Sequence, residues 1–228
     1  MTQITDHLAD ILERVARASQ SAQRSDARVT IVAVSKQQPV AAIREAFAAG
    51  QRDFGESYVQ EALAKMDALA DLAITWHYVG RIQTNKTRDI AARFQWVHTV
   101  DRPKIALRLS EQRPHYAPPL NVLIQVNQAG EAQKGGVRPE QVAALAHEIA
   151  ALPRLKLRGL MTIPPADADP TPWFEGLASL RSRLAAEGIS LDTLSMGMSD
   201  DFETAIAAGS TCVRIGAAIF GSRTRAET

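Results

Sequence analysis

Short apolar runs rich in β-branched residues alternate along this chain with longer, alanine-rich stretches in which apolar residues recur at helical spacing. The alternation begins with VTIVAVS at residues 29–35 and VAAIREAFAAG at residues 40–50. A helical pattern over residues 4–19 precedes it, with five apolar residues on one face: Ile4, Leu8, Ile11, Leu12 and Val15. The pattern therefore predicts one helix followed by a regular series of strands and helices.

The series contains eight predicted strands, at residues 29–35, 52–57, 75–80, 96–100, 120–127, 155–163, 191–197 and 211–221. Helical patterns follow the first seven, at residues 40–50, 58–69, 85–94, 102–112, 139–152, 172–188 and 201–209. Such alternation is typical of parallel strands joined by right-handed crossovers. It predicts an α/β fold, a single (β/α)8 TIM barrel with an extra N-terminal helix. An open doubly wound sheet is the alternative, but SKQQP at residues 35–39 lacks the glycine-rich first loop of that fold.

Composition and charge exclude several classes of function. The chain has 228 residues, 46% of them hydrophobic and 22% charged, with a formal net charge of +1. This balance is ordinary for a globular protein, and the scattered basic residues do not favour nucleic-acid or acidic-membrane binding. No linker divides the chain, so we expect one domain over residues 1–228. No exposed apolar stripe is predicted, which favours a monomer.

The N-terminal segment and the cysteine count bear on location. Asp6, Asp10 and Glu13 interrupt the first apolar pattern, so no signal peptide is predicted. No apolar run approaches the roughly 20 residues of a membrane-spanning helix. Cys212 is the single cysteine, so no internal disulfide can form and a reducing compartment is expected. We therefore expect a cytoplasmic protein that makes no membrane contact.

Candidate chemistry is concentrated where the predicted strands end, because all carboxyl ends of a parallel barrel meet on one face. Lys36 ends the first strand, and three interpretations are open: a solvated end residue, a phosphate clamp, or an amine that forms an imine. Gly197 and Ser199 precede a predicted helix, and Gly216 is expected directly after the last strand, in the segment RIGAAIFG. Backbone N–H groups at such positions bind phosphate. The sequence therefore predicts a phosphorylated ligand on the same face as Lys36.

Several further side chains have simpler interpretations. Ser199 could instead cap the following helix, and Asp200 and Glu203 are predicted to form a capping pair there. His77 and His98 are expected to be core or hydrogen-bonded histidines, and Cys212 a packed thiol. No His, Cys and Asp residues have metal-ligand spacing, so no metal site is predicted.

Arg214, in the last predicted strand, is expected to project into the pocket that holds Lys36. Pyridoxal phosphate sites combine a Schiff-base lysine with an Asp or Arg at the pyridine nitrogen. An arginine stays protonated and would donate to an unprotonated ring nitrogen, which weakens the ring as an electron sink. The alternative is that Arg214 pairs with an acidic residue across the barrel.

Seven segments together carry a resemblance to a known family: VAVSK, FGESYVQEALAK, WHYVGRIQTNK, HTVDR, NVLIQVN, LRGLMTIP and LSMGMSDDFETAIAAGSTCVRIGAAIFG. The chain resembles the pyridoxal phosphate homeostasis protein family, whose fold is similar to the N-terminal barrel domain of bacterial alanine racemase. The resemblance extends from about residue 5 to residue 223.

The resemblance implies a bound pyridoxal 5′-phosphate joined to Lys36 as a Schiff base. It implies cofactor contacts at these residues: Lys36, Ser57, Met198, Ser199, Arg214, Gly216 and Ala217. It also implies a role in vitamin B6 and amino or keto acid homeostasis without robust catalytic turnover. Other B6 vitamers and apo forms of pyridoxal phosphate enzymes are then the candidate partners.

The chain departs from the family pattern at two positions. Ser57 stands where the family usually has Asn, and KGG at 134–136 stands where it usually has KSG.

Two other functions are open for this chain. An amino acid racemase is the first alternative, but racemisation needs proton-transfer groups on both faces of the cofactor ring. Tyr58 is near the predicted mouth, and we expect no C-terminal β-domain like that of the racemases. The second alternative is noncovalent binding of another phosphorylated metabolite, with Lys36 as its counter-charge.

Overall fold

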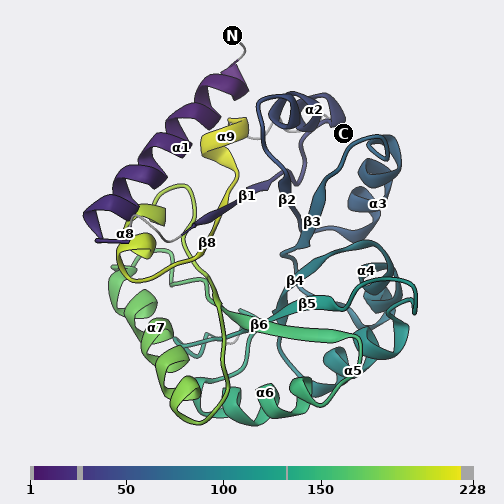
Figure 1. The fold of residues 1–228 in the computed structure, drawn as a ribbon, viewed down its shortest axis with the longest axis vertical. Helices are drawn as coiled ribbons and strands as arrows, with labels where there is room; N and C mark the ends of the chain where they lie inside the picture. The colour runs from purple at the N-terminus through teal and green to yellow at the C-terminus, as the bar shows by residue number, and fades with distance from the viewer. Residues whose placement is uncertain (1–2, 25–27, 132, 222–228) are drawn as a thin grey trace.

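The computed structural model of the protein describes residues 3–24, 28–131 and 133–221, and its strands form one closed parallel barrel (Figure 1). The strands are β1 (Thr30–Val34), β2 (Asp53–Glu56), β3 (Thr75–Tyr78), β4 (Trp96–Val100), β5 (Leu120–Gln125), β6 (Leu155–Met161), β7 (Thr193–Ser195) and β8 (Cys212–Ile215). Each strand pairs with its neighbour in chain order, and β8 closes on β1 with Ala33 opposite Ile215. The barrel prediction is confirmed, and the open-sheet alternative is excluded.

Helices surround the barrel as an outer ring (Figure 1). They are α1 (Gln3–Ser21), α2 (Val40–Ala48), α3 (Val59–Ala68), α4 (Thr87–Arg93), α5 (Pro103–Gln112), α6 (Val142–Ala150), α7 (Thr171–Ala186), α8 (Phe202–Ala207) and α9 (Ala217–Phe220). Single 3₁₀ turns, η1 (Thr84–Lys86) and η2 (Pro139–Gln141), precede α4 and α6. The extra N-terminal helix is confirmed as α1, which packs against α8 and α9 and covers the part of the ring where the barrel closes.

The last predicted strand, residues 211–221, is only partly correct. Strand β8 ends at Ile215, and the apolar run after Gly216 forms the short helix α9. The N–H groups of Ile219 and Phe220 donate to the Gly216 carbonyl oxygen at 3.0 and 2.9 Å. A short apolar run has no periodicity that separates strand from helix, so only the backbone contacts of the folded chain decide this boundary.

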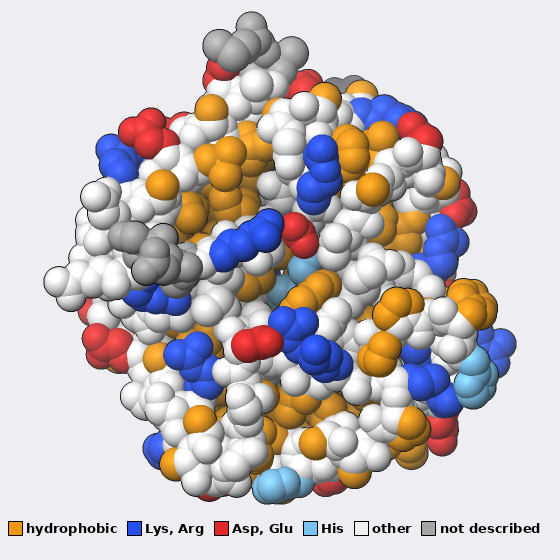
Figure 2. Space-filling view, viewed as in Figure 1, with side chains coloured by type: hydrophobic (Ala, Val, Ile, Leu, Met, Phe, Trp, Pro, Cys, Tyr) orange, Lys and Arg blue, Asp and Glu red, His pale blue; other side chains and the backbone are white. Residues whose placement is uncertain are grey.

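Between the strands and the helices lies an apolar layer that contains the largest buried side chains, among them Phe54, Phe94, Phe174 and Phe202. The buried set also includes polar residues on the strands, which is unusual for a barrel interior filled mainly by branched aliphatic side chains. His77 and His98 are 2% and 0% exposed. Figure 2 shows histidine side chains at the floor of a hollow in the centre of one face of the molecule.

Both histidines are hydrogen-bonded, as predicted. His77 Nε2 lies 3.0 Å from Asp53 Oδ1, and His77 Nδ1 lies 2.9 Å from His98 Nε2. Burial lowers the pKa of His77, with Asp53 opposing the effect. Burial lowers the pKa of His98 well below its ordinary value, and the positive charge of Arg214 and the neighbouring His77 add to the decrease. Both rings are therefore neutral near pH 7.

The lowered histidine pKa values predict that the protein loses stability in mild acid. Unfolded histidines take up protons as the pH falls below about 6.5, whereas the folded pair resists protonation. The unfolded state then binds more protons, so the free energy of unfolding falls as the pH decreases from about 6.5 toward the folded pKa values. Urea denaturation between pH 7.5 and 5 measures this slope. A His98→Gln variant should show a shallower decline, and an equal decline would contradict the assignment to this pair.

Candidate functional site

Lys36 lies directly after β1, next to the turn that follows β8. An added Cβ at Gly216 would lie 3.2 Å from the carbonyl oxygen of Val34, so only glycine allows the two backbones this close approach without a shift. Lys36 is half-buried two residues beyond Val34. The fold thus brings Lys36 and Gly216–Ala217 together from opposite ends of the chain.

The loop after β7 joins the same corner. Ser199 Oγ accepts a hydrogen bond from the Ala218 N–H group at 3.3 Å, and the Arg214 N–H group donates to the Gly197 carbonyl oxygen at 3.0 Å. Gly197 has a φ of +97°, and an added Cβ there would lie 2.7 Å from the Ala205 side chain. The Ser199 loop and the Gly216 turn therefore form one cradle of small residues and backbone beside Lys36.

The predicted capping pair of Asp200 and Glu203 is wrong. Helix α8 begins one residue later than that pairing requires, with Asp201 as the N-cap residue and no side-chain cap bond. Asp201 Oδ1 instead accepts from the Met198 N–H group at 2.6 Å, and burial raises the pKa of this carboxyl. Glu203 accepts two hydrogen bonds from Arg14 of α1, at 3.0 and 3.1 Å. A partner distant in sequence has replaced the local one.

Arg214 extends through the barrel interior and is only 5% exposed. Its Nη1 donates to Ser195 Oγ at 2.7 Å, and its Nη2 donates to the Thr162 carbonyl oxygen at 3.1 Å. Among the described residues it forms no ion pair within 4.0 Å, so the predicted alternative of an acidic partner across the barrel is not observed. Neutral acceptors therefore hold the guanidinium in place.

A buried ion-pair network beneath Lys36 was not anticipated from the sequence. Lys65 of α3 is 5% exposed, and its Nζ donates to Glu56 Oε1 at 2.8 Å and to Glu61 Oε1 at 2.5 Å. Ser35 Oγ donates to the same Glu56 oxygen at 2.6 Å. Burial raises the pKa of Glu56 although Lys65 and Ser35 oppose the shift. The available signals in the sequence were the Glu61–Lys65 helical spacing and the position of Glu56 at the end of a predicted strand.

This network holds the backbone on both sides of Lys36. Lys65 Nζ donates to the carbonyl oxygen of Ser35 at 2.6 Å, and Glu61 Oε1 accepts from the N–H group of Gln37 at 2.5 Å. Gln37 has a φ of +61°, a conformation that is rare for a residue with a side chain. The direction in which Lys36 leaves the strand is thus set by partners on β2 and α3.

Ser57 and Met198 lie beside the cradle rather than within its hydrogen bonds. Ser57 lines a cavity of about 350 Å³ after β2 and β3, together with Tyr58, Tyr78, Arg81 and other residues. Met198 is 38% exposed and lines a separate cavity of about 440 Å³ near Pro164 and Asp201. The structure therefore groups Lys36, Ser199, Gly216 and Ala217, holds Arg214 in the barrel interior, and places Ser57 and Met198 in flanking cavities.

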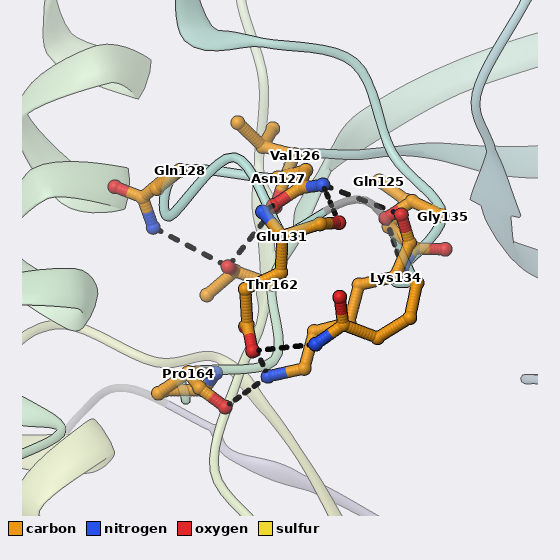
Figure 3. Close-up of polar contacts among 10 residues, drawn as sticks. Gln125, Val126, Asn127, Gln128, Glu131, Lys134, Gly135, Thr162 and Pro164 are labelled. Carbon is orange, nitrogen blue, oxygen red and sulfur yellow. Dashed lines mark hydrogen bonds and ion pairs between the residues drawn. The ribbon is translucent and has the colours of Figure 1, made fainter. Parts of the chain in front are cut away.

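The loop after β5 is hydrogen-bonded to the loop after β6 (Figure 3). Lys134 Nζ donates to the Pro164 carbonyl oxygen at 2.9 Å and lies 2.6 Å from Glu131 Oε2. Gln125 Nε2 donates to the Gly135 carbonyl oxygen at 2.8 Å. A Cβ added at Gly135 would contact its nearest neighbour, Asp101 Oδ2, at 3.5 Å, so the available space does not require glycine at this position.

Neither a cluster of metal-ligating side chains nor a membrane-spanning helix is found among the described residues. Within residues 3–24, 28–131 and 133–221, no group of three or more His, Cys, Asp or Glu side chains is placed to hold a metal ion. None of the helices in the described part of the chain has the length and apolar character needed to cross a membrane.

Comparisons with known proteins agree with this fold. The family described as alanine racemase, N-terminal domain, matches residues 7–224. The pyridoxal phosphate homeostasis protein of Pseudomonas aeruginosa is 56% identical over 223 residues, which cover 98% of this chain and 97% of the relative. That of Escherichia coli K12 is 47% identical over 233 residues, covering 98% of each chain.

Solved structures place the chain in the same class. PipY of Synechococcus elongatus, with pyridoxal phosphate bound, is 36% identical with a TM-score of 0.84, and the match covers 96% of this chain and 100% of PipY. An alanine racemase of Clostridium difficile has a TM-score of 0.72 at 15% identity over 57% of its own chain, which shows the fold alone. The class is thus the barrel of alanine racemase N-terminal domains. Within that class, the chain belongs to the pyridoxal phosphate homeostasis protein family.

Proposed function

We propose that this chain binds pyridoxal 5′-phosphate as a Schiff base on Lys36 and takes part in vitamin B6 and amino or keto acid homeostasis. The observation that most directly supports this proposal is that Lys36 lies at the same corner of the barrel as the cradle of Ser199 and Gly216. The relatives named for pyridoxal phosphate homeostasis, and PipY with the cofactor bound, support the choice of ligand.

The residues present fit this cofactor. A Cβ at Gly216 would fill the space beside Val34, and small side chains at Ala217 and Ala218 leave the backbone accessible to a phosphate. Ser199 supplies a hydroxyl beside these groups, and Met198 precedes it on the same loop, with its N–H group bonded to Asp201 Oδ1. Ser57 would contact the cofactor from the loop after β2, with a hydroxyl where relatives usually have an amide. The bound group would supply an aldehyde that condenses with an amine.

The permanent charge of Arg214 favours a protein that binds and holds the cofactor over one that uses it in catalysis. Its guanidinium is donor-only and stays protonated, so beside the pyridine nitrogen it would leave that nitrogen unprotonated. Such a ring withdraws electrons poorly, which disfavours carbanion chemistry. We therefore propose no robust turnover and no catalytic residue. Racemisation is the competing function, and measurable loss of optical rotation from L-alanine would support it instead.

We propose one cofactor-binding domain that acts as a monomer in the cytoplasm, with other B6 vitamers and apo forms of pyridoxal phosphate enzymes as candidate partners. A transfer assay tests the last point. Purified protein loaded with cofactor is mixed with an apo-enzyme, and the regained activity of that enzyme is compared with the value obtained from free cofactor.

Covalent attachment is tested by trapping. Purified protein incubated with pyridoxal 5′-phosphate is expected to show an imine absorbance band that borohydride removes. Peptide mass spectrometry should then find one phosphopyridoxyl group, on Lys36. A trapped group on another lysine would contradict the assignment, and noncovalent binding without any trapped group would favour the interpretation of Lys36 as a counter-charge.

A further inference from the structure

A continuous line of polar groups crosses the barrel interior from the buried Arg214 to the partly exposed Asp53. Arg214 Nη1 lies 2.7 Å from Ser195 Oγ, which lies 2.9 Å from His98 Nδ1. His98 Nε2 lies 2.9 Å from His77 Nδ1, and His77 Nε2 lies 3.0 Å from Asp53 Oδ1. These five residues come from β8, β7, β4, β3 and β2, so the line spans the barrel rather than following one strand.

When both histidine rings are neutral, the hydrogen bonds of the line can all form in one direction only. A guanidinium can only donate, and a carboxylate can only accept. Ser195 therefore accepts from Arg214 and donates its O–H to His98 Nδ1. His98 then donates its Nε2–H to His77 Nδ1, and His77 donates its Nε2–H to Asp53. Both histidines are neutral in this order, and both carry the proton on Nε2.

Burial makes any other placement of the histidine protons energetically unfavourable. Ser195 and His98 are 0% exposed, and His77 is 2% exposed, so water has little access to replace a lost partner. The rings are also held by packing, since His77 stacks on Trp96 with centroids 5.6 Å apart and planes 10° apart. Moving either histidine proton to Nδ1 would set donor against donor or leave a buried acceptor without a hydrogen. The pKa of Cys212 near Ser195 is raised to about 11 by burial, so this thiol adds no charge.

We propose that His98, acting through Ser195, is a positioning residue for Arg214. The line from Asp53 fixes which nitrogen of each histidine carries the proton, and this arrangement keeps the Arg214 guanidinium oriented toward the cofactor pocket. This inference rests on the proposed function, because the pyridine nitrogen is the group that Arg214 would face. The neutral state of both rings, which follows from their lowered pKa values, is consistent with this order.

The Asp53 end of the line opens at the opposite face of the barrel. A cavity of about 250 Å³ there is lined by His77, Trp96, Arg158 and Cys212 among others. The Asp53 side chain is 29% exposed, and Arg158 lies over the Trp96 ring with its guanidinium carbon 4.8 Å from the centroid. The line therefore connects the proposed cofactor corner with a solvent-facing group at the far end of the strands.

The proton order can be tested without any cofactor. Nitrogen-15 histidine spectra of the cofactor-free protein resolve five rings, and His77→Gln and His98→Gln variants assign the two buried ones. At pH 7.5 each buried ring is expected to carry a single proton, on Nε2. A proton on Nδ1 of either ring, or a doubly protonated ring, would overturn the proposed order.

The positioning role is tested with two matched serine variants. Ser195 and Ser210 are both 0% exposed, but Ser210 Oγ donates only to backbone carbonyl oxygens and takes no part in the line. Ser195→Ala is expected to weaken pyridoxal 5′-phosphate binding roughly tenfold, because it removes the buried partner of Arg214 Nη1 and of His98 Nδ1. It should also change the absorbance of the bound cofactor. Ser210→Ala is expected to lower stability while leaving both cofactor measurements within about twofold.

The outcomes separate this inference from the proposed function. Equal cofactor affinity and spectrum in the Ser195→Ala and wild-type proteins would overturn the positioning role, as would an equal loss in Ser210→Ala. Ser195→Thr keeps the hydroxyl and is expected to restore the wild-type spectrum. If wild-type protein bound no pyridoxal 5′-phosphate at all, the proposed function would fail, while the histidine spectra would still report on the proton order.

Discussion

Replacing Lys36 with alanine is expected to abolish the imine absorbance band and the borohydride-trapped adduct. The variant removes the amine that would condense with the aldehyde but leaves Ser199, Gly216 and Ala217 in place. Weak, noncovalent binding through the phosphate should therefore remain. Absorbance titration measures the band, and equilibrium dialysis with pyridoxal 5′-phosphate measures the residual binding.

The control for this variant is Lys104→Ala. Lys104 is an exposed lysine on α5, away from the Lys36 corner, and it should keep the full band and the full adduct. An unchanged band in Lys36→Ala would remove the basis of the proposed covalent attachment. Complete loss of phosphate-dependent binding would instead show that the cradle contributes little without the lysine.

Replacing Lys65 with methionine is expected to lower the free energy of unfolding by about 3–5 kcal/mol, the usual cost of removing one partner of a buried ion pair. Methionine nearly matches the length of the side chain but leaves Glu56 buried without its cation. The Glu56 carboxyl already has a raised pKa because of burial, and its Oε2 has no hydrogen-bond partner among the described residues. Urea denaturation at pH 7.5 measures the loss.

Two comparisons make the Lys65 result specific. Arg44→Met removes a surface ion pair, Arg44 to Asp71 at 2.7 Å, and should have a much smaller effect because water replaces the lost partner. Adding Glu56→Gln to Lys65→Met should recover part of the lost stability, since the uncompensated charge is removed. A Lys65→Met protein as stable as the wild type would contradict the burial argument.

The same network predicts a functional effect of Lys65→Met. Lys65 and Glu61 hold the backbone of Ser35 and Gln37 on either side of Lys36. Loss of these bonds should slow formation of the Lys36 adduct even under conditions where the variant is folded. A stopped-flow measurement of the imine band, at a temperature well below the unfolding midpoint, separates this effect from unfolding.

The sequence by itself determined the architecture except at the boundary between β8 and α9. Alternating strand and helix periodicities predicted the closed barrel and its N-terminal helix, because periodicity is a local property that follows from which side chains face an apolar layer. It also placed Lys36, Ser199 and Gly216 at strand ends, and parallel topology brings strand ends to one face. The cofactor roles of these residues and of Ser57 and Met198 remain predictions.

Only the tertiary structure decided which polar groups meet. Glu203 was assigned a local capping partner from its spacing, yet it binds Arg14 from a helix 189 residues away. Lys65 and Glu56, and the line from Asp53 to Arg214, join residues from separate elements whose spacing along the chain carries no sign of contact. The physical reason is that a buried polar group takes whichever partner the packed fold brings within hydrogen-bond distance, and that distance is set by three-dimensional packing rather than by local periodicity.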